Sequence, residues 1–288
     1  SLHRTGVHPD LPSTLRNPLP DHPRFAEIPA PALERLRAQW GERSYVDDSE
    51  IAHHPRIGRH QLAVTGVAAA MCSLMGVAGD ERRECLALAL LHDGTKLPEL
   101  VVGRLAALQL SPMEFDLPPG REQGEILRRI GVPLEVIARM EAAAGLTGSG
   151  SLPRFLTGGV HGPLELAPTR LAHAVVHLAD DMVSETVLMP LNNRMIASDF
   201  TTKYPFLWTT GLAAVEVPDG VEFLPVSAGA PIPPGAVVVG SAADLQVAVT
   251  EAMSAALLAR LGVNRSEPPN AALTRIVGEE LGRLGLRG

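Results

Sequence analysis

The chain has 288 residues and a formal net charge of −7 at pH 7, which argues against a broad surface for nucleic acid or for an anionic membrane. Apolar residues make up 45% of the chain, but aromatic residues make up only 3%. Alanine, leucine and valine must therefore fill the core, and this composition favours helices. We therefore expect an all-α protein. No signal peptide or membrane-spanning run is apparent, so we expect the protein to be cytoplasmic.

The first part of the chain is rich in proline. Residues 1–31 contain seven prolines, which exclude a long helix and predict an extended arm that lies on the body of the protein. Pro31 then suits the first turn of a helix that runs to about Trp40. After a loop rich in charge and histidine, the next helix is expected over residues 58–75, with His60 in its first turn.

A second helix of this region is predicted over residues 81–92, with Asp80 as its N-cap. It ends on a His-Asp-Gly tripeptide, and a further helix is expected over residues 99–110. The two cysteines of the chain, Cys72 and Cys85, fall within apolar helical runs. We interpret them as reduced core residues rather than as a disulfide or as metal ligands.

The middle of the chain predicts two short helices, over residues 121–131 and 133–144. The glycine-rich stretch that follows, residues 145–163, is expected to be a loop that is long enough to have a functional role, such as a lid over a site. Thr169 is the predicted cap of a strong helix from residue 170 to about residue 188.

The last third of the chain changes character. Residues 200–240 combine proline, glycine and short β-branched runs, so we expect loops with a small hairpin there. Ser241 and Asp244 begin a long helix that runs to Leu261, and a shorter helix is expected near residues 270–284.

These elements predict three parts of the chain. The first is the extended arm over residues 1–31, and the second is a helical domain over residues 32–190. The third is an irregular C-terminal extension over residues 191–288 that packs on the core. Its segment 200–240 is a candidate interface for a homodimer.

Four side chains form the candidate metal site: His60, His92, Asp93 and Asp180. They come from separate segments, and facing helices of a bundle aim such side chains at one point. Imidazole and carboxylate together suit a divalent ion such as Mn, Fe, Co, Ni or Zn, with Mg as a further candidate. A water bound to such an ion supplies hydroxide near neutral pH. The alternative for His92 is a histidine that the dipole stabilises at a helix C-terminus.

This ordered set resembles the HD-domain superfamily of metal-dependent phosphohydrolases, whose signature is H…HD…D. The resemblance covers roughly residues 58–185. HDGTK is similar to an HD-x-x-K variant, and QGEILRRIGVPLEVI (123–137) and GSGSLP (148–153) resemble flanking features of HD-GYP-type members. The resemblance implies an HD-domain-like helical bundle in which Asp180, rather than the adjacent Asp181, faces the metal.

The chain departs from the two-metal members of that superfamily at two places. Those members have histidines before the G-x-E-I-L helix and again before the GSG loop. This chain has Pro-Gly-Arg at 119–121 and Ala-Ala-Ala at 142–144, and neither triplet supplies a metal ligand. We therefore expect one ion rather than two.

Three further histidines are candidates for a second metal site or for hydrogen bonds to the ligands. His173, His177 and Asp180 fall at i, i+4 and i+7, on one helical face. His161 lies in the glycine-rich stretch. A place in the core is the more common role of such histidines.

A phosphate substrate needs positive charge beside the metal. Lys96 lies three residues beyond Asp93, and both are candidate catalytic residues, with Lys96 also binding substrate. Arg56 and Arg59 flank His60 and are candidates for phosphate binding. The alternatives are a solvated lysine at a helix start and arginines in surface salt bridges.

Three functions remain open on the sequence alone. The first is a phosphohydrolase with one metal, acting on a small phosphate ester such as a nucleotide or sugar phosphate. The second is an oxygenase with an HD-type iron pair, in which the further histidines replace the missing ligands. The third is a non-catalytic HD-like module for ligand sensing or protein interaction. We favour the first, because phosphate-ester chemistry needs mainly the positioning and charge that these residues supply.

Overall fold

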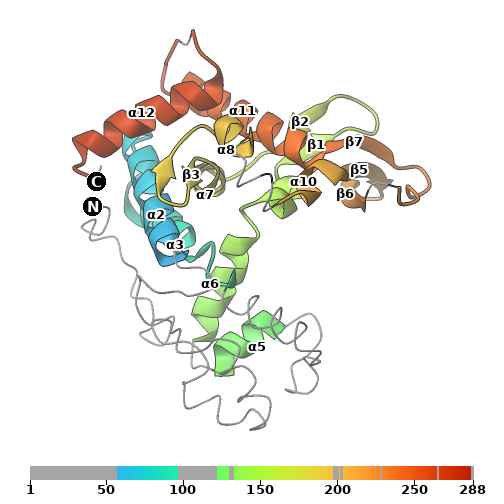
Figure 1. The fold of residues 1–288 in the computed structure, drawn as a ribbon, viewed down its shortest axis with the longest axis horizontal. Helices are drawn as coiled ribbons and strands as arrows, with labels where there is room; N and C mark the ends of the chain where they lie inside the picture. Colours follow the sequence, from blue (N-terminus) through green and yellow to red (C-terminus); the bar gives the residue numbers. More distant parts are fainter. Residues whose placement is uncertain are drawn as a thin grey trace.

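Figure 1 shows the fold of the chain as a computed structural model. The structure describes residues 57–96, 122–129, 133–196, 201, 204–227, 229–264 and 266–286. The expected N-terminal arm, the helix that ends near Trp40, the helix over 99–110 and the candidate Arg56 lie outside these residues. Within them, helices are accompanied by three small antiparallel sheets. The expectation of an all-α protein is therefore wrong.

Three helices that contact one another form the centre of the structure. They are α2 (Ile57–Leu74), α3 (Gly79–Leu91) and α7 (Leu171–Asp181). Val64, Ala68 and Cys72 on α2 are fully buried, and their small size lets the facing helices approach closely. Both cysteines are buried free thiols, as the sequence predicts.

The start of α3 differs from the prediction. Asp80 is not its N-cap, because the helix begins at Gly79 and Ala78 occupies the cap position. Asp80 instead lies in the first turn, where its negative charge is favourable beside the positive end of the helix dipole.

The glycine-rich stretch is structured rather than one long loop. It follows the helices α5 (Glu122–Arg129) and α6 (Leu134–Ala144), which fall where the sequence predicts them. The stretch itself contains the 3-10 helix η5 (Ser149–Arg154) and the strand β1 (Leu156–Gly158), which pairs antiparallel with β2 (Leu164–Leu166). Gly158 has φ +77°, and a Cβ there would collide with the Pro163 carbonyl oxygen. This tight hairpin therefore requires glycine.

α7 is shorter than the sequence predicts. The expected helix continued to residue 188, but α7 ends at Asp181 and the chain enters the hairpin of β3 (Val183–Ser184) and β4 (Val187–Leu188). Valine in both strands favours extended backbone over helix. Thr169 does not cap α7, because its hydroxyl donates to Ala167 O at 3.1 Å and Arg170 holds the N-cap position.

Residues 200–240, where a small hairpin among loops was expected, contain a sheet of three strands. The short helices α8 (Leu191–Ile196) and α10 (Phe206–Thr209) precede it. Its strands are β5 (Thr210–Val217), β6 (Gly220–Ser227) and β7 (Val237–Ser241), in the antiparallel order β6-β5-β7. In β5, Leu212, Ala213 and Ala214 are all buried, so the strand lacks the clear polar alternation that predicts a strand from sequence.

The last two helices are α11 (Ala242–Arg260) and α12 (Pro269–Arg283). The predicted cap of α11 is confirmed, because the Ser241 hydroxyl accepts from the Asp244 N–H at 3.1 Å. Figure 1 shows α12 beside α2, and the two helices contact one another. One hydrophobic core includes side chains from α2, α3, α7, α11 and α12.

In the described part of the chain, α11 is the one helix whose length and composition would allow it to cross a membrane. Its partners in this structure are protein elements, because it contacts α7, α12 and the strand β5. The helix therefore occupies the place of a core helix.

Candidate metal centre

The contacts among α2, α3 and α7 bring the four candidate ligands together. His60 lies in the first turn of α2, and His92 holds the C-cap position of α3, with Asp93 next to it. Asp180 lies in the last turn of α7. Three helix ends thus meet at one point, where side chains reach beyond the ends of the helical backbone.

The separations between the candidate ligand atoms would allow these atoms to share one metal ion. His60, His92 and Asp93 offer atoms that all lie within 4.8 Å of one another. Asp180 falls outside that group of three, but its Oδ1 lies 3.0 Å from His60 Nε2 and 3.5 Å from His92 Nε2. Asp93 Oδ2 lies 3.7 Å from His92 Nε2 and 4.0 Å from His60 Nε2. Atoms that share one ion at about 2.1 Å lie about 3 to 4 Å apart.

Main-chain carbonyls fix the orientation of both imidazoles. His92 Nδ1 donates to Ala89 O at 2.7 Å, and His60 Nδ1 donates to Glu185 O at 3.0 Å. A carbonyl oxygen can only accept, so Nδ1 carries the proton in both rings. Nε2 of each ring is then the nitrogen that faces the carboxylates, and a hydrogen bond of this kind on the far nitrogen is typical of metal-binding histidines.

His92 Nε2 is the atom that fits a metal best. The His92 side chain is fully buried, and Nε2 has no hydrogen-bond partner in the structure. A buried polar atom without a partner is costly, and an ion between Nε2 and the two carboxylates would satisfy it. The donor set of two imidazoles and two carboxylates therefore fits a divalent ion.

Charge at this point favours a cation. Burial disfavours the imidazolium of His92, but the carboxylates of Asp93 and Asp180 outweigh it and raise its pKa to about 9. Burial also disfavours the Asp180 carboxylate, but the hydrogen bond from His60 and the nearby His92 lower its pKa well below the usual value. The centre thus attracts positive charge, which a proton or a metal ion can supply.

The candidate substrate-binding residues are placed only in part. The backbone N–H of Lys96 donates to Asp93 O at 3.0 Å, so the lysine belongs to the turn that carries two of the ligands. It is partly buried. Arg59 lies on α2 next to His60, but its side chain is outside the described part of the structure.

The further histidines do not join the cluster. His177 Nδ1 donates to Leu146 O at 2.8 Å, and its Nε2 faces Asp181 Oδ2 at 3.3 Å rather than Asp180. His161 is exposed and pairs with Glu216 of β5 at 3.1 Å. His173 is half-buried on α7, and burial lowers its pKa. Among the described residues, His60, His92 and Asp93 are the one group found that could hold a metal ion.

Asp180 and Asp181 have separate environments although they are adjacent. The Asp181 side chain is buried, and its Oδ1 accepts from Gln246 Nε2 of α11 at 2.8 Å. Burial raises the pKa of Asp181. The second carboxylate therefore serves a contact between α7 and α11, and the first faces the two imidazoles.

Two groups that contact the candidate ligands could not be predicted from the sequence. One is the Glu185 carbonyl, which no side-chain pattern reveals. The other is Arg194 of α8, whose Nη1 donates to the carbonyl oxygen of Asp180 at 2.6 Å. Its charge also helps to lower the Asp180 pKa. An arginine that binds main chain has no motif, so no signal in the sequence would have identified it.

The fold and the site together define a mixed, largely helical protein with a buried His/Asp cluster that could hold a metal ion. No protein-family model, no curated protein and no solved structure matches the chain. Membership of the HD-domain superfamily is thus not established, and the buried His/Asp cluster is the feature that bears on activity.

Proposed function

We propose that the protein is a metal-dependent phosphohydrolase that acts on a small phosphate ester, such as a nucleotide or sugar phosphate. The observation that carries this proposal is the buried Nε2 of His92. It has no hydrogen-bond partner and faces two carboxylates and a second imidazole.

One divalent ion would be held by His60, His92, Asp93 and Asp180. When bound, such an ion lowers the pKa of a water molecule and neutralises charge on a phosphate oxygen. The protein's own residues would position the reactants. Main-chain hydrogen bonds keep both imidazoles in the tautomer that leaves Nε2 available, and Arg194 holds the backbone of Asp180.

Exposure of the ligands indicates the side from which a substrate would arrive. The His92 side chain is fully buried, whereas 18% of the Asp93 side chain and 12% of the His60 side chain are accessible. Substrate would therefore approach past Asp93. Lys96 follows in the same turn, where an ammonium group would bind a phosphate oxygen and stabilise charge that develops in the transition state.

The di-iron oxygenase alternative has less support than the phosphohydrolase. It needs replacements for the missing second-metal histidines, and the candidates were His161, His173 and His177. His177 pairs with Asp181, and His161 pairs with Glu216. The non-catalytic module remains the competing proposal, because it needs only the cluster and no turnover.

The test combines metal analysis with turnover. The full chain would be purified, stripped with a chelator and reloaded with Mn²⁺, Fe²⁺, Co²⁺, Ni²⁺, Zn²⁺ or Mg²⁺. Phosphate release would then be measured on a panel of nucleotides and sugar phosphates. We expect about one ion per chain and metal-dependent release that is lost in His92→Ala.

Lys96→Met separates substrate binding from metal binding. It should keep the ion but reduce kcat/KM by about 100-fold, because a charged contact to phosphate is lost. The exposed Asp219→Asn is the matched control and should keep both. One ion per chain with no release on the whole panel would support the non-catalytic module, and no bound ion in any metal solution would refute the phosphohydrolase.

A further inference from the structure

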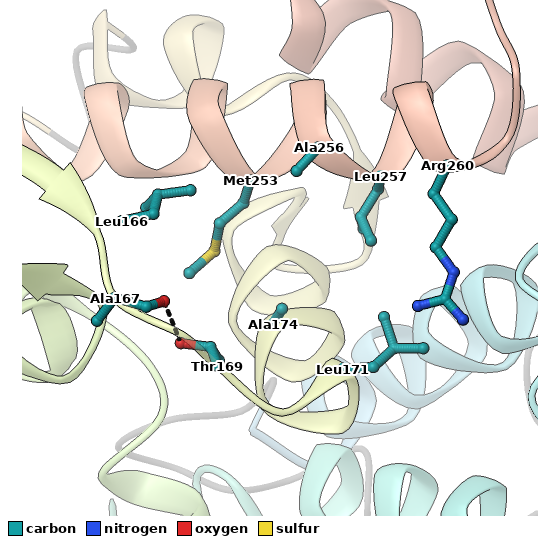
Figure 2. Close-up of a pocket in the computed structure, with 9 residues that line it drawn as sticks. All are labelled: Leu166, Ala167, Thr169, Leu171, Ala174, Met253, Ala256, Leu257 and Arg260. Atoms are coloured by element: carbon teal, nitrogen blue, oxygen red, sulfur yellow. Dashed lines mark hydrogen bonds between the residues drawn. The ribbon is translucent and has the colours of Figure 1, made fainter.

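A second site of interest is a cavity of about 320 Å³ between α11 and the segment that leads from β2 into α7. Figure 2 shows α11 along one side and Leu166, Thr169 and Leu171 on the other. None of the candidate metal ligands lines it. Its volume is at the small end of the range for ligand cavities in proteins.

Most of the side chains that line the cavity are apolar. Met253 and Leu257 of α11 are buried and extend toward the segment below them, and Ala174 of α7 lies opposite (Figure 2). The Thr169 hydroxyl already donates to Ala167 O. It can therefore accept a hydrogen bond from a ligand, but its proton is not available for an anion.

Arg260, the last residue of α11, supplies a positive charge at one end of this cavity. Figure 2 shows its guanidinium extending from α11 toward Leu171. Two other exposed arginines are paired, Arg170 with Glu84 and Arg275 with Glu267. Arg260 forms no ion pair with any residue in the described part of the chain. A positive charge at a helix C-terminus is favourable in itself, so Arg260 alone does not indicate a ligand. The combination of this charge with the apolar side chains of the cavity does.

We propose that the cavity binds a small amphipathic monocarboxylate. Its apolar body would lie between Met253 and Leu257 on one side and Leu166 on the other, and its carboxylate would bind Arg260. A guanidinium matches the two oxygens of a carboxylate with two parallel donors. A phosphate dianion would require further donors, and the Thr169 proton is already engaged. The proposal is independent of the phosphohydrolase assignment.

Octanoate, below its micellar concentration, is the first probe, and 1-octanol is its uncharged counterpart. Isothermal titration calorimetry on the full chain should show saturable binding of octanoate at one site. In Arg260→Gln the octanoate affinity should fall by about tenfold or more, because a charged hydrogen bond is lost. The affinity for 1-octanol should change by less than about twofold. Arg275→Gln, which alters a paired arginine of α12, is the matched control and should leave both unchanged.

The location of binding has its own test. Ala256 lines the cavity from an exposed position of α11, so Ala256→Phe should fill the cavity and abolish binding of both probes. The methyl resonance of Met253 in the unaltered chain should shift on addition of octanoate, and this readout needs no variant. The proposal is overturned by a wild-type protein that binds no octanoate. It is also overturned by an equal loss of both probes in Arg260→Gln, or by a Met253 signal that does not respond.

Discussion

At the scale of single residues, the centre depends on how each imidazole is held. His60 and His92 both donate from Nδ1 to a main-chain carbonyl, which leaves Nε2 directed at the carboxylates. In the absence of an ion, a proton is the cation that can occupy this place. Metal binding must therefore displace a proton, and the affinity for metal must depend on pH.

The pH dependence follows from the raised pKa of His92, which is about 9. Below that pH the metal-free imidazole is protonated, so each unit of rise in pH toward 9 should increase metal affinity by about tenfold. Calorimetry with Zn²⁺ in buffers of different ionisation enthalpy should report proton release at pH 7. An affinity that is flat between pH 6 and pH 8 would contradict this assignment of the proton.

Asp180→Asn tests the ligand that α7 contributes. The substitution keeps the shape of the side chain but removes the charge that faces both imidazoles, so metal affinity should fall by about 100-fold. Competition with a chromogenic chelator measures the change. The same substitution at the adjacent residue, Asp181→Asn, should reduce affinity far less, because that carboxylate faces His177 and Gln246.

At the scale of elements, α7 carries two adjacent aspartates that have different roles. Asp180 faces the cluster, and the pair His177–Asp181 ties α7 to α11 and to the turn before η5. The Phe155 ring lies 4.6 Å from the His177 ring, measured between centroids. Because this pair is fully enclosed by protein, removal of one partner leaves the other without compensation.

His177→Leu should lower the free energy of unfolding by about 3 kcal/mol, since Leu146 O loses its donor and Asp181 loses its partner. Urea unfolding followed by circular dichroism gives this value. The metal content of the folded variant should equal that of the wild type. His173→Leu, a half-buried change on the same helix, should cost less than about 1 kcal/mol. A loss of metal from the His177→Leu variant would instead show that His177 is a metal ligand.

The sequence predicted the long helices α2 and α11 well because they are long runs rich in alanine and leucine, which are strong helix formers. The bounds of α2 and α11 could be predicted to within about two residues for this reason. The strands of the sheets are short or evenly buried, as in Leu212–Ala214 of β5, so they carry little alternation. The four residues that converge at the cluster could be selected from their chemistry and order. The Glu185 contact uses a main-chain carbonyl and Arg194 binds the Asp180 carbonyl, so no side-chain pattern predicts either contact.

At the scale of the whole molecule, the first and last helices of the described chain pack against each other. α12 packs against α2, and Arg283 of α12 donates to the Ser73 hydroxyl of α2 and also binds Glu280. The helix that carries His60 is thus covered by the C-terminal helix. Stability of the metal centre and of the C-terminal contact should therefore be linked.

Glu280 supplies a test of this contact. The bond from Arg283 lowers the pKa of Glu280 to about 2, below its usual value. Its stabilisation is therefore fully present above the usual value near 4.5 and is lost as pH falls toward 2. Arg283 is exposed to solvent, which limits the effect to about 1 kcal/mol.

In denaturant unfolding, Glu280→Gln should be less stable than the wild type by about this amount at pH 7 and equally stable near pH 2. The exposed neighbour Glu279→Gln should differ by no more than about 0.5 kcal/mol at either pH. A difference for Glu280→Gln that persists in acid would show that its origin is not the charge.

The turn between β3 and β4 has a consequence for how this protein would respond to mutation. The Glu185 carbonyl holds His60, and the residue has a left-handed backbone conformation with φ 57°. An alanine substitution would not remove this contact, because alanine keeps the carbonyl. Valine or isoleucine, which tolerate that conformation poorly, would rotate the carbonyl away and free the ring, whereas glycine or asparagine would preserve it. In related chains, position 185 should therefore exclude β-branched residues.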